Sequence, residues 1–267
     1  MELTGTVGIL TGASRGIGVY LAEHLAKAGV NLALAARSES GLEAVAGMVR
    51  SMGVEAITVP ADVTRRSDLQ RIVKRTNEEL GDIDLLVNNA GIEHYSFYEQ
   101  LEPNEIEHLL KTNVLGPQLL TRHVLPQMIE RRKGHIVNLA SVAGLTAVPY
   151  NTIYSASKHA LVGFSRSLRE EMAEHNVGVS VICPVFVREA GMFQASKNGA
   201  EPPGAVGTVD PDTVAARTIK AIRRDTPEVV VAARGTRFAG ILLTIAPRFT
   251  SAMGRRSGAY EFNKPKD

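Results

Sequence analysis

Short apolar runs and longer amphipathic segments alternate along this 267-residue chain from its first residues to about residue 232. In the longer segments, such as residues 69–80, apolar residues recur at the spacing of a helix. The short runs are rich in Val, Ile and Leu and mostly apolar throughout, which is typical of strands covered on both faces. We therefore predict strands near Val7–Leu10, Asn31–Ala35, Ala56–Pro60, Leu85–Asn88, His135–Asn138, Val179–Cys183 and Glu228–Val231.

This alternation predicts an α/β fold, a single doubly wound domain with about seven parallel strands and helices on both faces of the sheet. We place this domain at residues 1–235 and expect it to hold both the ligand and the catalytic groups. Residues 188–210 are rich in Gly and Pro and lack periodicity, which favours a lid over the site. Residues 236–267 are expected to form a basic, partly apolar extension.

Composition and charge exclude several other classes of protein. The only cysteine, Cys183, cannot form a disulfide within the chain, so we expect a reducing compartment and a cytoplasmic location. A net charge of +2 is too small to indicate a nucleic acid as the main partner. The most apolar stretch, Ala239–Ala246, is less than half the ~20 residues of a transmembrane helix, so we expect no membrane span. We also expect no secretory signal, because the first predicted strand begins at Val7. The seven histidines show neither HExxH nor a cluster with cysteine, so no metal site is expected.

Positive charge is concentrated at the end of the chain. From Arg234 onward there are seven Lys or Arg and two Asp or Glu, a net charge of +5. Two interpretations of this tail stay open. It is either a basic amphipathic segment, in weak contact with a membrane surface or covering the pocket, or an ordinary capping helix or oligomer contact. We favour the second over the membrane, because the cluster is shorter than the polybasic segments that bind lipid strongly.

A glycine-rich turn follows the first predicted strand and leads into the next helix, which begins at Ile17. Glycine permits a tight turn and a close approach of the backbone to a pyrophosphate, whose charge the free N–H groups of the helix start then bind. A plain connection between strand and helix is the alternative. The strand before and the helix after favour a dinucleotide site, formed by Gly12, Ser14, Arg15, Gly16, Ile17 and Gly18.

The end of the second predicted strand indicates which dinucleotide binds. NAD-binding proteins commonly present an acidic residue there, whereas this chain has Arg37, with Arg15 as a second cation. A guanidinium matches the geometry of the extra phosphate of NADP. Solvated surface arginines are the alternative, but two cations and no acid favour NADP(H) over NAD(H).

Tyr154 and Lys158 stand one turn apart on the same face of a predicted helix. Ser141 lies just past a strand, and Asn113 lies in a helix upstream. With these residues the chain resembles the short-chain dehydrogenase/reductase family over residues 5–232. The resemblance is carried by Gly12, Gly16, Gly18, Asp62-Val63, Asn88-Asn89-Ala90-Gly91, Asn113, Ser141, Tyr154 and Lys158.

The resemblance implies a Rossmann fold, a nicotinamide cofactor, and interconversion of a carbonyl compound and a secondary alcohol. It implies that Asp62 and Val63 lie near the adenine and that Asn89, Ala90 and Gly91 lie along the cofactor ribose. Asn113 would anchor a water molecule that relays protons. A homodimer or homotetramer is also implied by the resemblance alone.

The pair of Tyr154 and Lys158 suits proton transfer on elementary grounds. An ammonium about 4–6 Å from a phenol favours the phenolate and is expected to lower the tyrosine pKa by roughly 1–3 units. Tyr154 would then act as the general acid on a carbonyl oxygen, which Ser141 would hold, while Lys158 also binds the cofactor ribose. For Ser141 the alternative is an ordinary hydroxyl at the end of a strand.

One segment departs from the family pattern. A Pro-Gly pair and then a threonine usually pack on the nicotinamide, but this chain has Pro184-Val185-Phe186-Val187-Arg188-Glu189. We still expect Pro184 and Val187 to contact the cofactor, whereas Val185 adds bulk where the ring passes. This departure motivates a rival hypothesis, a cofactor-sensing or scaffold protein with little turnover.

The substrate is the least constrained prediction. The segments expected to wall the pocket are mainly apolar, which favours NADPH-dependent reduction of a lipophilic or acyl-linked ketone. Glu93, His94, Arg188 and Glu189 are polar exceptions, and we interpret His94 as a surface histidine rather than a second acid. The apolar set comprises Ile92, Tyr95, Phe97, Val142, Leu145, Val148, Tyr150, Phe186, Met192 and Phe193.

Overall fold

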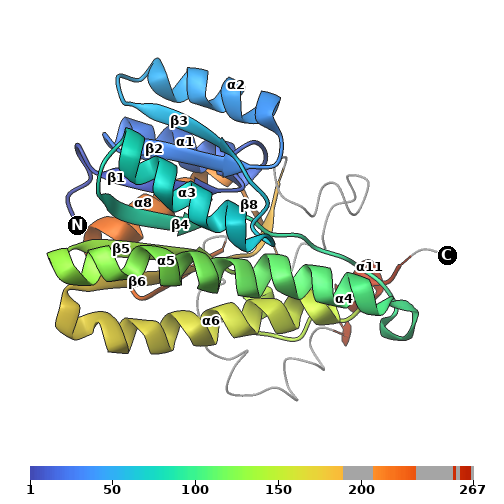
Figure 1. Ribbon diagram of the computed structural model, residues 1–267. Coiled ribbons are helices and arrows are strands. Elements are labelled where there is room, and N and C mark those ends of the chain that lie inside the picture. Colours follow the sequence, from blue (N-terminus) through green and yellow to red (C-terminus); the bar gives the residue numbers. More distant parts are fainter. Residues whose placement is uncertain (189–206, 233–254, 257–258, 266–267) are drawn as a thin grey trace.

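A computed structural model describes residues 1–188, 207–232, 255–256 and 259–265 (Figure 1). Seven parallel strands form one sheet in the order β3-β2-β1-β4-β5-β6-β9, which confirms the predicted fold class and all seven predicted strands. The strands are β1 (Val7–Thr11), β2 (Asn31–Ala36), β3 (Ala56–Pro60), β4 (Ile83–Asn88), β5 (Gly134–Leu139), β6 (Val177–Pro184) and β9 (Glu228–Val231).

Successive side chains along each central strand enter opposite layers of the core. In β1, Leu10 packs into the cluster that contains α1 (Ile17–Lys27), α2 (Glu39–Arg50) and α8 (Pro211–Arg224). Its neighbour Ile9 packs into the cluster beneath α3 (Arg66–Glu79), α5 (Gly116–Arg131) and α6 (Thr152–Met172). Because both faces are covered in this way, the strands are apolar without alternation.

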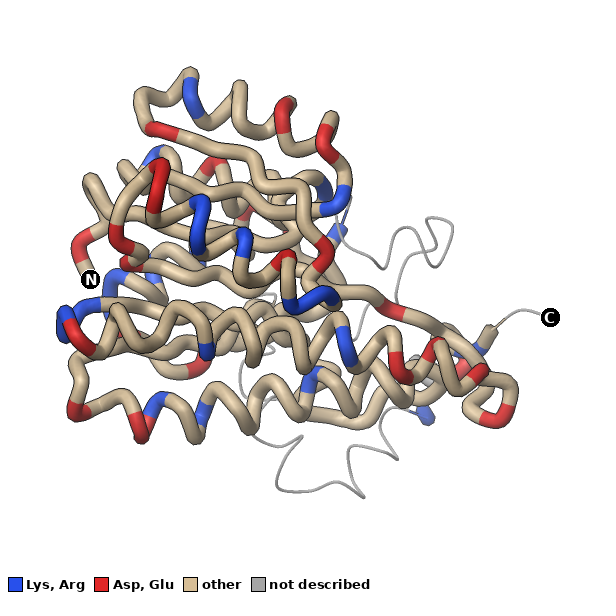
Figure 2. The backbone as a smooth tube through the Cα atoms, in the orientation of Figure 1, with Lys and Arg blue, Asp and Glu red and all other residues tan. Residues whose placement is uncertain are grey.

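Charged residues are almost absent from the sheet and lie on helices and connections (Figure 2). Among Lys, Arg, Asp and Glu, the seven strands hold only Asp84 in β4 and Glu228 in β9. Asp84 is buried, and Arg131 and Lys133 approach its carboxylate to 2.8 and 3.1 Å. The charge of this carboxylate is therefore balanced where the chain enters β4.

The chain adds β2 and β3 on one side of β1 and then β4 and the later strands on the other side, so the strand order reverses between β1 and β4. This position lies beside the glycine turn that follows β1. Ligands of open α/β sheets bind beyond the carboxyl ends of the strands at such a point. The helix α4 (Pro103–Leu110) continues through a π-helical turn, η2 (Lys111–Leu115), directly into α5. Short 3₁₀ turns complete this part of the chain at η1 (Tyr98–Gln100), η3 (Val142–Gly144) and η4 (Ala173–His175).

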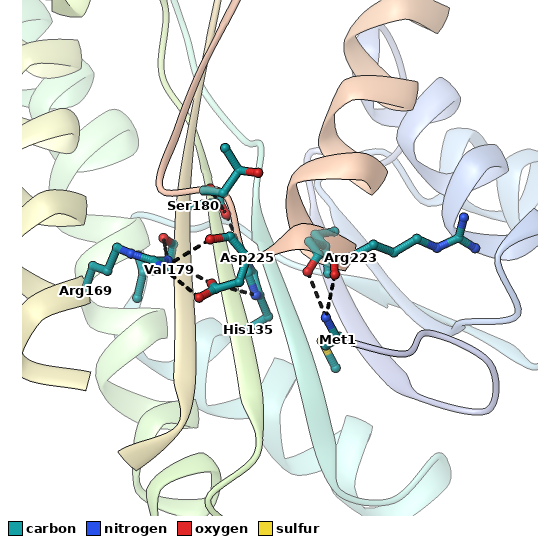
Figure 3. Close-up of polar contacts among 9 residues, drawn as sticks. Met1, His135, Arg169, Val179, Ser180, Arg223 and Asp225 are labelled. Atoms are coloured by element: carbon teal, nitrogen blue, oxygen red, sulfur yellow. Dashed lines mark hydrogen bonds and ion pairs between the residues drawn. The ribbon is translucent and has the colours of Figure 1, made fainter. Parts of the chain in front are cut away.

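A polar network around the buried His135 lies at the amino end of β5, opposite the end of the strands that holds the glycine turn (Figure 3). His135 lies 2.9 Å from the hydroxyl of Ser180 and 3.8 Å from the carboxylate of Asp225. Arg169 holds Asp225 with two side-chain hydrogen bonds of 2.8 and 2.6 Å. Burial lowers the pKa of His135 to about 4, although the charge of Asp225 acts in the opposite direction.

The predicted lid and tail fall largely outside the described residues. Residues 189–206 of the lid are not described, but its flanks pair as a two-stranded sheet of β7 (Phe186–Val187) and β8 (Thr208–Val209). Of the extension, the structure describes residues 255–256 and 259–265, including α11 (Ala259–Asn263). Phe262 of α11 meets Phe186 of β7 edge to face, with ring centres 6.1 Å apart. No helix in the described part of the chain has the length and apolar character needed to cross a membrane.

Candidate active site

The glycine turn is shaped by close approach to the end of β4. Gly12 has a φ of +66°, and a Cβ atom added there would lie 2.9 Å from Ala90 Cα. A Cβ on Gly18 would lie 3.0 Å from both Ala13 Cα and the side chain of Asn89. These positions therefore admit only glycine without displacement of the backbone, and α1 begins directly after the turn, at Ile17.

Asn89 braces this turn from the neighbouring strand. Its side-chain amide donates to the carbonyl oxygens of Thr11 and Gly12 over 2.9 and 3.1 Å. In return, the hydroxyl of Thr11 accepts hydrogen bonds from the backbone N–H groups of Asn89 and Ala90, at 3.0 and 3.1 Å. The ends of β1 and β4 are thus locked together at the switch point.

Arg15 and Arg37 are both exposed at the carboxyl ends of β1 and β2. Neither lies within ion-pair distance of a carboxylate among the described residues. Partial burial acts to raise the pKa of Asp62, but hydrogen bonds from Thr64 and the charges of Arg37 and Arg65 hold it below its ordinary value. Arg37 therefore lies near Asp62, and its guanidinium is available to an anionic ligand.

Two further predicted cofactor residues lie at the same end of the sheet. Ser14 stands against the first turn of α2, where a Cβ added to Gly41 would lie 3.0 Å from Ser14 Cβ. Val63, which follows β3, packs its backbone against Gly116 at the start of α5. The predicted set is therefore spread along the carboxyl ends of four adjacent strands, as an extended dinucleotide requires.

Asn113 lies in the π-helical turn and binds the loop that follows β4. Its amide donates to the carbonyl oxygen of Ile92 over 2.8 Å and accepts from the backbone N–H of Ile92 over 2.8 Å. The same amide nitrogen donates to the hydroxyl of Ser157 over 3.1 Å. A π-turn, which is frequent at functional sites, here aims this side chain at the loop beside Gly91.

Tyr154 and Lys158 are buried next to each other on α6, with 7% and 3% of their surface exposed. Lys158 Nζ donates to the carbonyl oxygen of Leu139 over 2.8 Å and lies 5.5 Å from the centre of the Tyr154 ring. Ser141 accepts a hydrogen bond from the N–H of Ala143 over 3.1 Å and also hydrogen-bonds the phenol of Tyr154.

The pKa of Tyr154 shifts in the direction opposite to the one expected from Lys158. Burial raises this pKa well above its ordinary value and the negative charge of Glu93 adds to the effect, while the hydrogen bond with Ser141 opposes it. Burial also lowers the pKa of Lys158 to about 8, although the nearby Cys183 and Glu93 act to raise it. The prediction of an acidified phenol was therefore wrong for this structure, because burial disfavours the charged form of both groups. Tyr154 is protonated at neutral pH, as a proton donor must be.

A cavity of about 110 Å³ joins these groups. Seven of the predicted site residues line it, namely Ile17, Asn89, Ser141, Tyr154, Lys158, Pro184 and Val187. Of the expected apolar wall, Tyr95, Val142, Val148 and Phe186 line the cavity, whereas Ile92, Phe97, Leu145 and Tyr150 do not. Met192 and Phe193 lie outside the described residues.

Val185 also lines the cavity, and its side chain packs against the core cluster beneath α1 and α8. Its backbone N–H donates to the carbonyl oxygen of Val231 over 3.0 Å, which fixes its position beside β9. The bulky side chain expected at position 185 therefore does form part of the cavity wall.

The remaining polar exceptions separate into surface and cavity groups. His94 is exposed and lies 3.7 Å from the carboxylate of Glu105, as expected of a surface histidine. Arg188 forms an exposed ion pair with Asp210 at 3.0 Å, and Glu189 is not among the described residues. Glu93, in contrast, lines the cavity and accepts a hydrogen bond from the side chain of Asn151 over 2.7 Å.

Sequence reasoning assigned no role to either Glu93 or Asn151. Their positions in the sequence could have indicated that they lie in the site, because Glu93 follows the end of β4 by a few residues and Asn151 precedes Tyr154 by three. Within the described residues, no group of three or more His, Cys, Asp or Glu side chains is placed to hold a metal ion.

Comparisons with known proteins agree with this geometry. A family model described as short chain dehydrogenase matches residues 6–201. Ketoacyl reductase HetN of Nostoc sp. is 41% identical over 229 residues, which cover 86% of this chain and 79% of HetN.

Solved structures of short-chain oxidoreductases and ketoreductases are also similar to this chain. A metagenomic short-chain oxidoreductase solved in complex with NADP is 32% identical, with a TM-score of 0.74 over 86% of this chain and 98% of that one. A variant of actinorhodin polyketide ketoreductase solved with NADPH is 30% identical, with a TM-score of 0.78 over 87% of this chain and 97% of that one.

Proposed function

The chain belongs to the short-chain dehydrogenase/reductase family of oxidoreductases, and from this premise we propose that it reduces a ketone to a secondary alcohol with NADPH. The observation that carries the proposal is that one cavity is lined by Tyr154, Ser141 and Lys158 together with Ile17 and Asn89. The cavity thus brings the proposed proton donor, Tyr154, close to Ile17 and Asn89, which border the proposed dinucleotide-binding turn.

Each of the three polar groups has a distinct task in the proposed reaction. A bound nicotinamide supplies the hydride. Tyr154 donates its phenolic proton to the carbonyl oxygen, and Ser141 holds that oxygen by a hydrogen bond and stabilises the negative charge that develops there. Lys158 provides a positive charge beside the tyrosine ring, at 5.5 Å from its centre, and binds the ribose hydroxyls. Asn113 positions the loop after β4 through Ile92, and we retain its proposed role in proton relay.

The preference for NADPH over NADH rests on Arg15 and Arg37. Both are exposed beside the turn, and no acidic residue ends β2 to hold a ribose hydroxyl. Asp62 and Val63 are proposed to border the adenine, and Ala90 and Gly91 the ribose. Similar solved proteins carry NADP and NADPH, which supports this assignment.

An acyl-linked or lipophilic ketone is the proposed substrate class. Apolar side chains, among them Val142, Val148 and Phe186, line much of the cavity. The names of the relatives, a ketoacyl reductase and a polyketide ketoreductase, support a ketone attached to an acyl chain.

A second candidate function is a cofactor sensor or scaffold with little turnover. It is favoured by one observation, namely that Val185 fills part of the wall beside Tyr154 where the family usually has glycine. The intact set of proton-transfer groups favours the enzyme.

Thermal unfolding together with an activity assay tests the proposal. Binding of a cofactor at 100 times its Kd stabilises the folded state by about 2.7 kcal/mol, so NADPH should raise the Tm by several degrees and NADH by less. Oxidation of NADPH should then be seen with a panel of ketones. Binding without turnover of any carbonyl compound would support the sensor instead, and a larger shift with NADH would contradict the assignment of the arginines.

Other expectations stay predictions. These are an assembly of two or four subunits, a cytoplasmic location, the lid at residues 188–210, the division at residue 235, and weak contact of the basic tail with a membrane surface. The Phe186–Phe262 contact supports the interpretation in which part of the tail covers the pocket, because Phe186 lines the cavity.

A further inference from the structure

Glu93 links the loop that follows β4 to the start of α6. Its Oε1 atom accepts a hydrogen bond from Asn151 Nδ2 over 2.7 Å, and Asn151 is the residue that directly precedes α6. Asn151 is 1% exposed, and its backbone carbonyl oxygen accepts from the N–H of Ser155 over 2.9 Å. The hydrogen bond with Glu93 therefore fixes the turn of α6 that carries Tyr154.

The loop itself is anchored immediately before Glu93. Asn113 binds both the N–H and the carbonyl oxygen of Ile92, each over 2.8 Å. Lys158 lies against the same loop, because a Cβ atom added to Gly91 would be 3.7 Å from Lys158 Nζ. Glu93 therefore follows directly from a fixed point of the chain, in a loop that borders Lys158.

Glu93 and Lys158 bring opposite charges to one cavity. Among the described residues that line it, they are the only two from the classes Lys, Arg, Asp and Glu. Burial lowers the pKa of Lys158 to about 8, while Cys183 and Glu93 act to raise it. Since an isolated buried charge is unfavourable, an ammonium in this position is retained more easily with a carboxylate close by. Removal of the carboxylate of Glu93 should therefore favour loss of the proton from Lys158.

The other titratable groups around Lys158 stay neutral at the pH values where it titrates. Burial raises the pKa of Cys183, in β6, to about 12. Burial also raises the pKa of Tyr154, on α6, and of Tyr95, in the loop after β4, well above their ordinary values, and the charge of Glu93 adds to both shifts. In the described part of the chain, Glu93 is therefore the group near Lys158 whose negative charge acts on it in this pH range.

We propose that Glu93 is a positioning residue for the reduction of the ketone, which fixes the start of α6 through Asn151 and keeps Lys158 charged. This inference rests on the proposed function and adds a residue to it. Lys158 supplies the positive charge beside the ring of Tyr154, so it serves the reaction only while it holds its proton. The charge of Glu93 therefore extends the pH range of the reduction upward.

The experiment measures kcat and kcat/KM with NADPH for acetophenone and ethyl acetoacetate, a lipophilic and an acyl-linked ketone, on both sides of the pKa of Lys158. Glu93→Gln removes the charge but keeps an oxygen that can accept from Asn151. As the pH rises, its kcat/KM should decline at a lower pH than in the unaltered protein, with a several-fold loss at about pH 8.

Two further variants separate the hydrogen bond from the charge. Asn151→Ala removes the hydrogen bond and keeps the charge, so kcat should fall by roughly 10- to 100-fold, as misplacement of a reacting group does, while the alkaline limit stays in place. Glu93→Leu removes both and should show both effects. Glu99→Gln neutralises an exposed carboxylate outside the cavity and is the matched control, with an unchanged pH range and kcat.

A readout that needs no turnover separates this inference from the proposed function. NMR titration with isotope-labelled lysine, assigned by the loss of one signal in Lys158→Arg, should give a lower pKa for Lys158 in Glu93→Gln than in the unaltered protein. If no ketone is reduced, the proposed function fails, but this titration still decides the role of Glu93. An unchanged titration of Lys158 in Glu93→Gln, or full kcat in a folded Asn151→Ala, would overturn the inference.

Discussion

The ammonium of Lys158 lies 5.5 Å from the centre of the Tyr154 ring and donates its hydrogen bond to the carbonyl oxygen of Leu139. Both side chains are buried, so neither the phenolate nor the ammonium is solvated by water. Burial dominates the titration of both groups and keeps the phenol protonated. Tyr154 therefore holds its proton at neutral pH, while the raised pKa makes its phenol a weaker acid than that of a solvated tyrosine.

Removal of the Tyr154 hydroxyl should abolish reduction without affecting the binding of the cofactor. We expect Tyr154→Phe to lower kcat for ketone reduction by about 10²–10⁴-fold, the usual contribution of a general acid. The rise in Tm with NADPH should persist, because the ring and its contact with Lys158 remain. Steady-state kinetics and thermal unfolding measure the two effects, and a variant with full turnover would rule out Tyr154 as the proton donor.

Loss of Arg37 should weaken NADPH and spare NADH. A charge-assisted hydrogen bond to a phosphate contributes about 1.5–3 kcal/mol, so Arg37→Ala should raise the Kd of NADPH by roughly 10- to 100-fold. The Kd of NADH should change little, since NADH lacks the extra phosphate. Lys74→Ala, an exposed cation on α3, is the control. Titration calorimetry with both cofactors would reveal an equal loss for each if Arg37 had only a general electrostatic effect.

Shortening Val185 tests whether its bulk restricts the nicotinamide. We expect Val185→Gly to increase kcat several-fold and to change the Kd of NADPH little. The same change should lower the free energy of unfolding by about 1–3 kcal/mol, because the valine packs against the core and glycine gains freedom in the unfolded chain. An unchanged kcat in a folded variant would show that the valine does not limit turnover.

Acid should destabilise the fold through His135. Its pKa of about 4 in the folded protein lies below the ordinary value of 6.5, so the folded state binds fewer protons than the unfolded chain between these two pH values. The stability is therefore complete above pH 6.5 and is lost as the pH falls toward 4, by roughly 2–4 kcal/mol in total.

A variant isolates this contribution. In His135→Asn the midpoint of urea unfolding should vary less between pH 6.5 and 4 than in the unaltered protein, whatever its absolute stability. An identical pH dependence of the two proteins would assign the acid sensitivity to other groups.

The sequence was sufficient for the sheet because the strands are apolar on both faces. Its main shortfalls in the strands were at β4 and β6, which begin two residues earlier than predicted, because Asp84 and Gly178 interrupt the apolar runs. The two-residue strands β7 and β8 were not predicted, because strands this short leave no pattern.

The site was predicted where chemistry follows from neighbours in sequence, as for Tyr154 and Lys158. The hydrogen bond between Glu93 and Asn151 joins residues 58 positions apart, and only the packing of α6 beside the loop after β4 brings them together. The direction of the Tyr154 pKa was also out of reach, since it depends on burial, which spacing does not reveal.

The short stretch from Asn89 to Glu93 is anchored at both ends, by Asn89 on the glycine turn and by Ile92 on Asn113. A dinucleotide bound at the turn would therefore contact the same short stretch of chain that borders the pocket for the carbonyl group. Initial-rate kinetics should accordingly reveal a compulsory order of addition, with the nucleotide entering before the ketone and leaving last.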